Sequence, residues 1–168
     1  QKCMEEMEAG DVFLVDDWSS YEEHKCFIDE KISRGAKAIF LELDPGEYQI
    51  GEMEVSVKNS GMLPMNFASR NTGHPLTKGF TQFSFWNWYD RNEDRIAPIL
   101  DKTFTGTHFT PVLLSGNTNE DGEWNAAAAV GEGRMEKGLI YLCQLKLAGR
   151  VSDNPVAKEF FFRMLTNA

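Results

Sequence analysis

Residues 11–43, DVFLVDDWSSYEEHKCFIDEKISRGAKAIFLEL, decide the fold class. Residues 11–16 form a short apolar run that ends in acids, which is typical of a strand buried on both faces. Residues 36–43, AKAIFLEL, have the same character and predict a second strand. Between them, residues 20–34 carry apolar side chains at helical spacing, and Gly35 can end a helix there. Strand, helix and strand joined by short connections predict a right-handed βαβ unit and therefore a parallel sheet.

Two serines mark the expected start of this helix. Ser19 and Ser20 are each followed three residues later by a glutamate, at Glu22 and Glu23. A serine and a glutamate at this spacing form a capping box, in which each side chain accepts a hydrogen bond from the other residue's backbone amide. The sequence therefore predicts that the helix begins at about Ser20.

The middle of the chain lacks a helical period. Residues 46–101 contain prolines, glycines and an aromatic cluster, and we expect loops and short strands laid over the sheet. Within them, residues 53–57 alternate apolar and polar side chains, which predicts an edge strand. At 168 residues the chain has the size of one domain, so we assign residues 1–168 to a single unit.

The last third returns to regular patterns. Residues 110–115, 126–130 and 138–147 predict strands, and the glycine-rich residues 131–137 predict the hairpin connection between the last two. An Asn-Pro pair at residues 154–155 predicts the start of a helix, because asparagine caps a helix and proline fits its first position. The apolar stripe of that helix consists of Val156, Phe160, Phe161, Met164 and Leu165.

Composition and charge exclude several classes of function. Hydrophobic residues make up 42% and charged residues 26% of the chain, a balance typical of globular domains. The formal net charge is −9, and so acidic a surface repels nucleic-acid phosphates and anionic lipids. No apolar run approaches the roughly 20 residues that a membrane-spanning helix needs. We therefore expect neither a nucleic-acid partner nor a membrane span.

The cysteines and the first residues bear on the setting of the chain. Cys3, Cys26 and Cys143 are far apart and odd in number, so we expect no disulfide framework, no metal site and no cofactor. The chain begins with Gln1 and shows no secretory signal, and we interpret it as a piece of a longer protein. The residues alone leave the compartment of that parent protein open.

The end of the second strand is where a nucleophile would be expected, because ligands usually bind there in sheets of this type. Leu43, Asp44 and Pro45 occupy that place, with no cysteine or serine. The ring nitrogen of Pro45 carries no hydrogen and cannot donate to an oxyanion. We therefore expect no catalytic residue and interpret these three residues as a degenerate nucleophile elbow. A hydrolase that uses Cys143 or His74 is a further interpretation.

Paired carboxylates are a second candidate for catalysis. Glycosidases place two of them across the scissile bond of a sugar, and the chain has pairs at Asp16/Asp17 and Glu42/Asp44. With 26 acidic residues, such pairs also arise by chance. We interpret them as solvated acids in loops.

Aromatic residues offer a contact surface. Trp86, Trp88 and Tyr89 lie at near-alternate spacing, which would place ring faces on one side of a strand, and Trp124 supplies a fourth ring. Such rings can pack against a neighbouring protein domain or stack on sugar rings. The residues alone leave both alternatives open.

Four segments of the chain, in this order and spacing, carry a family resemblance. They resemble a C-terminal region of some bacterial glycoside hydrolase family 2 enzymes, the relatives of β-galactosidase and β-glucuronidase. The segments are GHPLTKGF at residues 73–80, FWNWYDRNEDRIAPIL at 85–100, DGEWNAAAAVGEGRMEKGLIYLCQLKLAGR at 121–150 and NPVAKEFFFRML at 154–165. The resemblance implies a flavodoxin-like, class I glutamine amidotransferase-like fold, as in β-galactosidase trimerisation domains. It would be a parallel sheet with flanking helices and an added C-terminal β-hairpin, lacking its first strand and helix.

The same resemblance limits the activity that can be expected. Amidotransferases of this fold have a Gly-x-Cys-x-Gly elbow, which Leu43, Asp44 and Pro45 replace here, and a His-x-Glu pair that is absent. The catalytic glutamates of family 2 belong to a TIM barrel of about 250 residues, which this chain is too short to contain.

The resemblance therefore implies a non-catalytic accessory domain of a periplasmic or secreted parent enzyme. Its partner would be the catalytic domain of the same parent chain or a second copy, contacted through the aromatic residues. The alternative is a carbohydrate-binding module that stacks an oligosaccharide on Trp86, Trp88 and Trp124.

Overall fold

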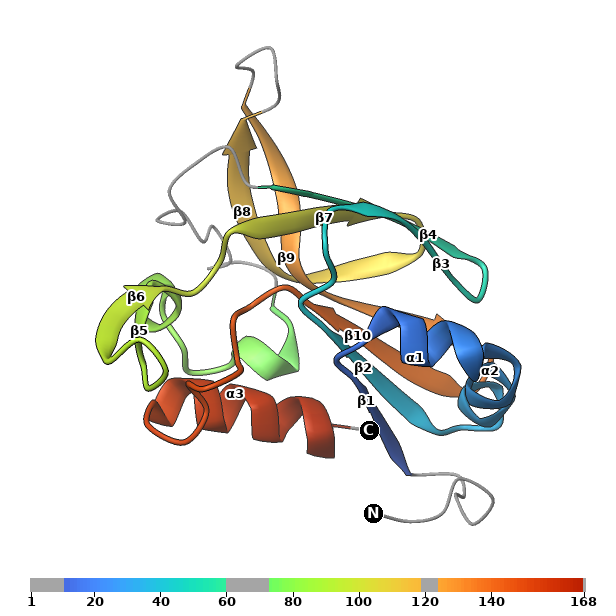
Figure 1. The fold of residues 1–168 in the computed structure, drawn as a ribbon. Coiled ribbons are helices and arrows are strands. Elements are labelled where there is room, and N and C mark those ends of the chain that lie inside the picture. The colour runs from blue at the N-terminus through green and yellow to red at the C-terminus, as the bar shows by residue number, and fades with distance from the viewer. Residues whose placement is uncertain (1–10, 60–72, 119–123, 168) are drawn as a thin grey trace.

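The computed structural model describes residues 11–59, 73–118 and 124–167 of the chain (Figure 1). It is a mixed α/β fold built mostly of strands around one curled, mixed sheet. Eight strands of the described ranges pair in the order β1 (Val12–Val15), β2 (Lys37–Leu41), β10 (Gly138–Cys143), β9 (Trp124–Met135), β7 (Lys102–Gly106), β4 (Met53–Asn59) and β3 (Gly46–Ile50), and β8 (Phe109–Thr118) pairs with β9. The expectations for residues 1–10, Cys3 among them, lie outside the described residues.

One half of the sheet is parallel and contains the predicted βαβ unit. β1 pairs with β2 in parallel, and β2 pairs in parallel with β10. α1 (Trp18–Glu23) and α2 (Lys25–Ser33) connect β1 to β2. Ile32 of α2 packs with Phe40 on one face of β2, and Phe160 of α3 (Pro155–Thr166) packs with Ile39 on the other (Figure 1). The expected parallel sheet is thus limited to three strands, and the remaining strands are antiparallel.

The predicted first helix is two helices, and its expected start was wrong. α1 ends at Glu23 and α2 begins at Lys25, with His24 between them. The cap is Asp17, whose carboxylate accepts hydrogen bonds from the amides of Ser19 at 3.3 Å and Ser20 at 3.0 Å. A charged carboxylate that accepts two amide hydrogen bonds is a stronger cap than a serine hydroxyl. The helix therefore begins two residues earlier than the serines predicted.

The antiparallel half corrects two expectations about strands. β4 is not an edge strand, because it lies between β3 and β7. The predicted hairpin between β9 and β10 is present, but its connection is shorter than residues 131–137, because β9 continues to Met135 and only residues 136–137 form the turn. A Cβ on Gly131 would lie 2.8 Å from the Phe104 ring, and a Cβ on Gly133 would lie 2.5 Å from the Met53 sulfur. These glycines therefore let neighbouring side chains cross the strand closely rather than form a turn.

The middle of the chain divides between two sheets. β3 and β4 belong to the main sheet, whereas β5 (Asn87–Asp90) and β6 (Arg95–Pro98) pair with each other alone. Two short 3₁₀ helices, η3 (Pro75–Thr77) and η4 (Gln82–Phe85), precede this hairpin. Leu76, Phe85 and Trp88 from this region are buried in the cluster that contains Ile39 and Phe160. The segment that includes η3, η4 and the β5–β6 hairpin therefore lies over the α3 side of the sheet.

The C-terminal helix is confirmed with its predicted stripe. Phe160 and Met164 are fully buried, and Val156, Phe161 and Leu165 pack against the same cluster. A buried lysine on β2 fixes the end of this helix to the sheet, because Lys37 Nζ donates to the carbonyl oxygens of Met164 at 3.0 Å and Leu165 at 2.8 Å. None of the helices in the described residues is long and apolar enough to cross a bilayer.

Candidate functional site

The residue that follows β2 is Glu42, and it has a left-handed backbone with φ = 48°. This conformation is uncommon outside glycine and turns the chain sharply at the carboxyl end of the strand. Leu43 is buried, and Asp44 is exposed with its carbonyl accepting the Tyr48 hydroxyl at 2.6 Å. Pro45 is also exposed. Because the left-handed residue is Glu42, the three residues expected at the elbow, 43–45, follow the turn and do not form it.

Asp16, Asp17 and Asp44 are exposed, as expected for solvated acids, whereas Glu42 is only partly exposed. Its side chain lines a pocket of about 590 Å³ together with Asp16, which follows β1. Burial raises the pKa of the Glu42 carboxyl, and the charges of Lys102 and Lys146 oppose this shift. The spacing of Glu42 and Asp44 in the sequence did not indicate that Glu42 is partly buried while Asp44 is exposed, because this difference depends on the left-handed turn between the two side chains.

The interpretation of Cys143 or His74 as a catalytic residue is not supported by their surroundings. Cys143 is fully buried in β10, and burial raises the pKa of its thiol to about 12, so it carries no thiolate near neutral pH. His74 Nδ1 accepts the amide of Leu76 at 3.3 Å, so Nε2 carries the proton and donates to Glu132 at 3.1 Å. Tyr141 donates its hydroxyl to the same Glu132 oxygen at 2.9 Å. These hydrogen bonds connect η3 to β9 and β10.

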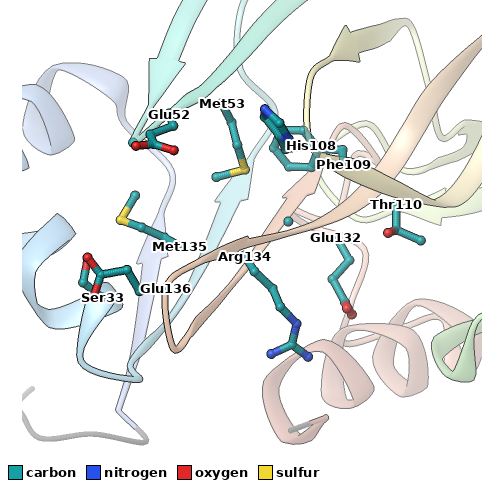
Figure 2. A pocket seen from close by; sticks show the side chains of 12 residues that line it. Ser33, Glu52, Met53, His108, Phe109, Thr110, Glu132, Arg134, Met135 and Glu136 are labelled. Carbon is teal, nitrogen blue, oxygen red and sulfur yellow. The ribbon is translucent and has the colours of Figure 1, made fainter.

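A second pocket, of about 730 Å³, is lined in part by residues 132–136 of the chain, Glu132 among them (Figure 2). Met53, Met135 and Phe109 give this pocket apolar walls, and Glu132 and Arg134 lie on the far side of β9 from Met53. Within the described part of the chain, no group of three histidine, cysteine or acidic side chains is placed to hold a metal ion.

The structure separates the aromatic residues expected to share one face. Trp88 is only 4% exposed and donates its indole N–H to the carbonyl of Ser84 at 2.9 Å, so it belongs to the core. Trp86 is partly exposed and stacks on Phe83 with ring centroids 5.9 Å apart. Tyr89 is partly exposed and donates its hydroxyl to Asp94. Trp124 begins β9, and its side chain lies outside the described residues.

Sequence reasoning missed the most exposed apolar side chains of this region. Phe83 is 64% exposed on η4, and Ile96 is 72% exposed on β6. Their signal was weak, because an isolated phenylalanine or isoleucine in a sequence is far more often buried. The surface formed by Phe83, Trp86 and Ile96 is called the aromatic surface below.

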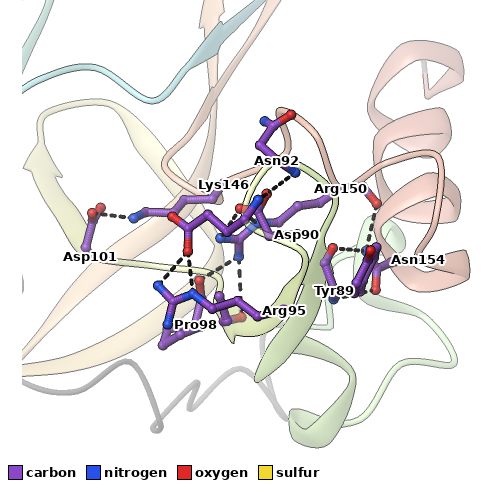
Figure 3. Close-up of polar contacts among 11 residues, drawn as sticks. Tyr89, Asp90, Asn92, Arg95, Pro98, Asp101, Lys146, Arg150 and Asn154 are labelled. Atoms are coloured by element: carbon purple, nitrogen blue, oxygen red, sulfur yellow. Dashed lines mark hydrogen bonds and ion pairs between the residues drawn. The ribbon is translucent and has the colours of Figure 1, made fainter.

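A buried ion pair holds the β5–β6 hairpin to the body of the domain (Figure 3). Arg150 donates through Nε and Nη2 to one oxygen of Asp90, at 3.0 and 2.8 Å, and through Nη1 to the carbonyl of Pro98 at 2.6 Å. Burial raises the pKa of Asp90, but hydrogen bonds from Arg150 and from two amides outweigh it, so the pKa is below its usual value. Asn154 adds reciprocal hydrogen bonds to the backbone of Tyr89, at 2.8 and 3.0 Å. The hairpin that carries Ile96 is thus fixed to the body of the domain, and η4, with Phe83 and Trp86, directly precedes it.

Comparison with known proteins adds no family assignment. No protein-family model matches the chain, and no curated protein matches it.

Proposed function

We propose that this chain is a non-catalytic accessory domain of a glycoside hydrolase family 2 enzyme of the β-galactosidase type. It acts by packing against the catalytic domain of the same parent chain through the aromatic surface, and a second copy of the domain is the other partner this surface fits. The family resemblance of residues 73–165 supports the parent, and the side chains around the elbow support the lack of catalysis.

The observation that carries this proposal is the exposed pair of stacked rings at η4, Phe83 on Trp86, together with the exposure of Ile96 on the β5–β6 hairpin. Single exposed apolar side chains are common, whereas neighbouring ones such as the Phe83–Trp86 pair form patches that mark interaction surfaces. Burying a phenylalanine or isoleucine side chain contributes about 1.5–3 kcal/mol, whereas an exposed ion pair contributes about 0–1 kcal/mol. Apolar contact therefore outweighs the surface charges in any association here.

The flavodoxin-like part of the proposal is supported by the parallel half of the mixed sheet. Three adjacent parallel strands, β1, β2 and β10, have helices packed on both faces, as the class I glutamine amidotransferase-like architecture requires. The antiparallel strands then extend this core. The lack of a cysteine or serine at Glu42, Leu43, Asp44 and Pro45, the residues that follow β2, supports the absence of a nucleophile in this proposal.

The alternative function is a carbohydrate-binding module. Trp86 stacked on Phe83 offers one aromatic platform for a sugar ring, whereas the buried Trp88 offers none. Sugar binding would therefore depend on Trp86, together with Trp124 if its side chain is open.

The test uses the intact parent enzyme with Phe83 and Trp86 both replaced by alanine. Loss of docking would lower the unfolding temperature of the parent and speed proteolysis at the junction of this domain, with little change in glycosidase kcat/KM. Phe162→Ala is the matched control, because Phe162 is 57% exposed but lies on α3. Identical behaviour of the double variant and the control would refute the proposal. Quenching of tryptophan fluorescence by oligosaccharides, abolished by Trp86→Ala, would favour the carbohydrate-binding alternative.

A further inference from the structure

The pocket beside Glu42 lies where ligands bind in open α/β sheets, at the carboxyl ends of parallel strands. Leu14 and Asp16 come from the end of β1, and Leu41 and Glu42 from the end of β2. The far wall is the connection of residues 147–151 together with Phe161 of α3. The volume of about 590 Å³ is enough for a small organic molecule.

The chemistry of the lining is one-sided. Its apolar part is Leu14, Leu41, Leu147, Val151 and Phe161. Its polar side chains are two carboxylates, Asp16 and Glu42, and none of the described residues that line it has a side chain able to donate a hydrogen bond. An anion would be repelled by the two carboxylates, and a sugar would find side-chain acceptors but no side-chain donor for its hydroxyl oxygens. A cation with an apolar body matches both parts of the lining.

The Glu42 carboxyl accepts a hydrogen bond from the amide of Ala148, and the nearby cations among the described residues are Lys102 and Lys146. The backbone amide of Glu42 donates to the carbonyl of Cys143 at 2.9 Å, which fixes the backbone at the strand end. The two lysines whose charges act on it are each paired with another acid: Lys146 with Asp101 at 2.6 Å, and Lys102 with Asp44 at 3.3 Å. The Glu42 carboxyl therefore keeps acceptor capacity for a ligand inside a partly desolvated space, where a charged hydrogen bond is stronger than in water.

We propose that this pocket binds a small organic amine in its protonated form. Glu42 and Asp16 accept hydrogen bonds from the ammonium group, and Leu14, Leu41 and Phe161 cover the hydrocarbon part. This site is distinct from the aromatic surface and does not depend on the proposed accessory function. The raised pKa of Glu42 agrees with a carboxyl that would ionise more readily beside a bound cation.

The test compares three probes of one shape at neutral pH: benzylamine as the cation, benzyl alcohol as the neutral analogue and benzoate as the anion. Binding is followed by NMR shifts of the methyl groups of Leu14, Leu41 and Val151, which line the pocket. We expect saturable binding of benzylamine, weaker binding of the alcohol by about tenfold or more, and no shifts with benzoate. Equal shifts from all three probes, or no saturable shift with benzylamine, would overturn the proposal.

Two variants assign the effect to named residues. Glu42→Gln keeps the shape of the side chain and should weaken benzylamine binding by about tenfold or more. Glu47→Gln removes one exposed carboxylate outside the pocket and should leave the affinity unchanged. Asp16→Asn gives a second measurement should Glu42→Gln fail to fold. An affinity that is the same in the Glu42, Asp16 and Glu47 variants would show that net charge, and not this pocket, attracts the amine.

Discussion

Replacing Gln144 by methionine should stabilise the domain. Gln144 follows β10 directly, its residue is 0% exposed, and neither its amide nitrogen nor its amide oxygen has a hydrogen-bond partner among the described residues. A buried polar group without a partner costs about 1–3 kcal/mol, because its hydrogen bonds to water are lost on folding and nothing replaces them. Methionine has nearly the same length and flexibility, so it fills the same space without the polar atoms.

The size of the gain follows from these contacts. With both amide atoms unsatisfied, we expect Gln144→Met to raise the free energy of unfolding by about 2 kcal/mol. For a domain of this size that corresponds to an increase in Tm of roughly 4–8 °C. Urea and thermal unfolding followed by circular dichroism measure both quantities. The backbone amide of Gln144 donates to the carbonyl of Ala129 at 2.8 Å and is untouched by the change.

A matched control separates burial from the change of residue type. Gln49 is exposed on β3, and its amide donates to the carbonyl of Gly51 at 2.8 Å. Gln49→Met should therefore change stability by no more than about 0.5 kcal/mol. A Gln144→Met protein that is no more stable than the original would refute the reasoning, since it would mean that the amide is satisfied in solution, for example by a buried water molecule.

Three further predictions concern other parts of the fold. Because burial raises the pKa of Glu42, its ionisation costs stability once the pH rises from about 4.3 through its higher folded value, so Glu42→Gln should stabilise the domain at pH 7 but not at pH 4 in urea unfolding. A Cβ on Gly138 would overlap two backbone carbonyl oxygens near the end of α2, so Gly138→Ala should cost about 3 kcal/mol or more in the same assay. Phe160→Ala should lower the free energy of unfolding by about 3–5 kcal/mol, whereas Phe162→Ala, on the exposed side of α3, should change it by less than about 0.5 kcal/mol. Equal losses from the two phenylalanine variants would contradict the assignment of the helix faces.

Local patterns in the sequence predicted those parts of the fold that depend on neighbouring residues. The βαβ unit and α3 follow from apolar spacing and from the Asn154–Pro155 start, and both were found. The edge position of β4 and the assignment of residues 131–135 to the hairpin connection were wrong, because both depend on partners distant in the chain. In the sequence, Gly131 and Gly133 are typical of a turn. In the structure they lie within a strand, where the absence of a side chain leaves room for Phe104 and Met53.

The candidate sites, too, differ from the prediction where their positions depend on tertiary contacts. Alternate spacing of Trp86 and Trp88 predicted that they share one face, but Trp86 is the C-cap of η4 and Trp88 lies in β5, where its side chain is buried in the core. The elbow was expected at residues 43–45 because the second strand was predicted to run to Leu43, whereas β2 ends at Leu41. Because the strand ends two residues earlier than predicted, Glu42 belongs to the turn and not to the strand. Boundaries of this kind depend on tertiary contacts, which the sequence pattern does not contain.

The two proposed sites share one segment of the chain, residues 147–151. Gly149 and Val151 line the pocket beside Glu42, and Arg150 between them binds Asp90 and Pro98 of the β5–β6 hairpin. The amide of Arg91 in the same hairpin donates to the carbonyl of Gly149 at 3.2 Å, which adds a backbone link. The pocket wall and the β5–β6 hairpin, which carries Ile96 of the aromatic surface, are therefore held by the same ion pair. A partner bound at the hairpin and a ligand bound in the pocket would both contact structure that residues 147–151 hold in place. The buried Arg150 therefore has a structural role at both proposed sites.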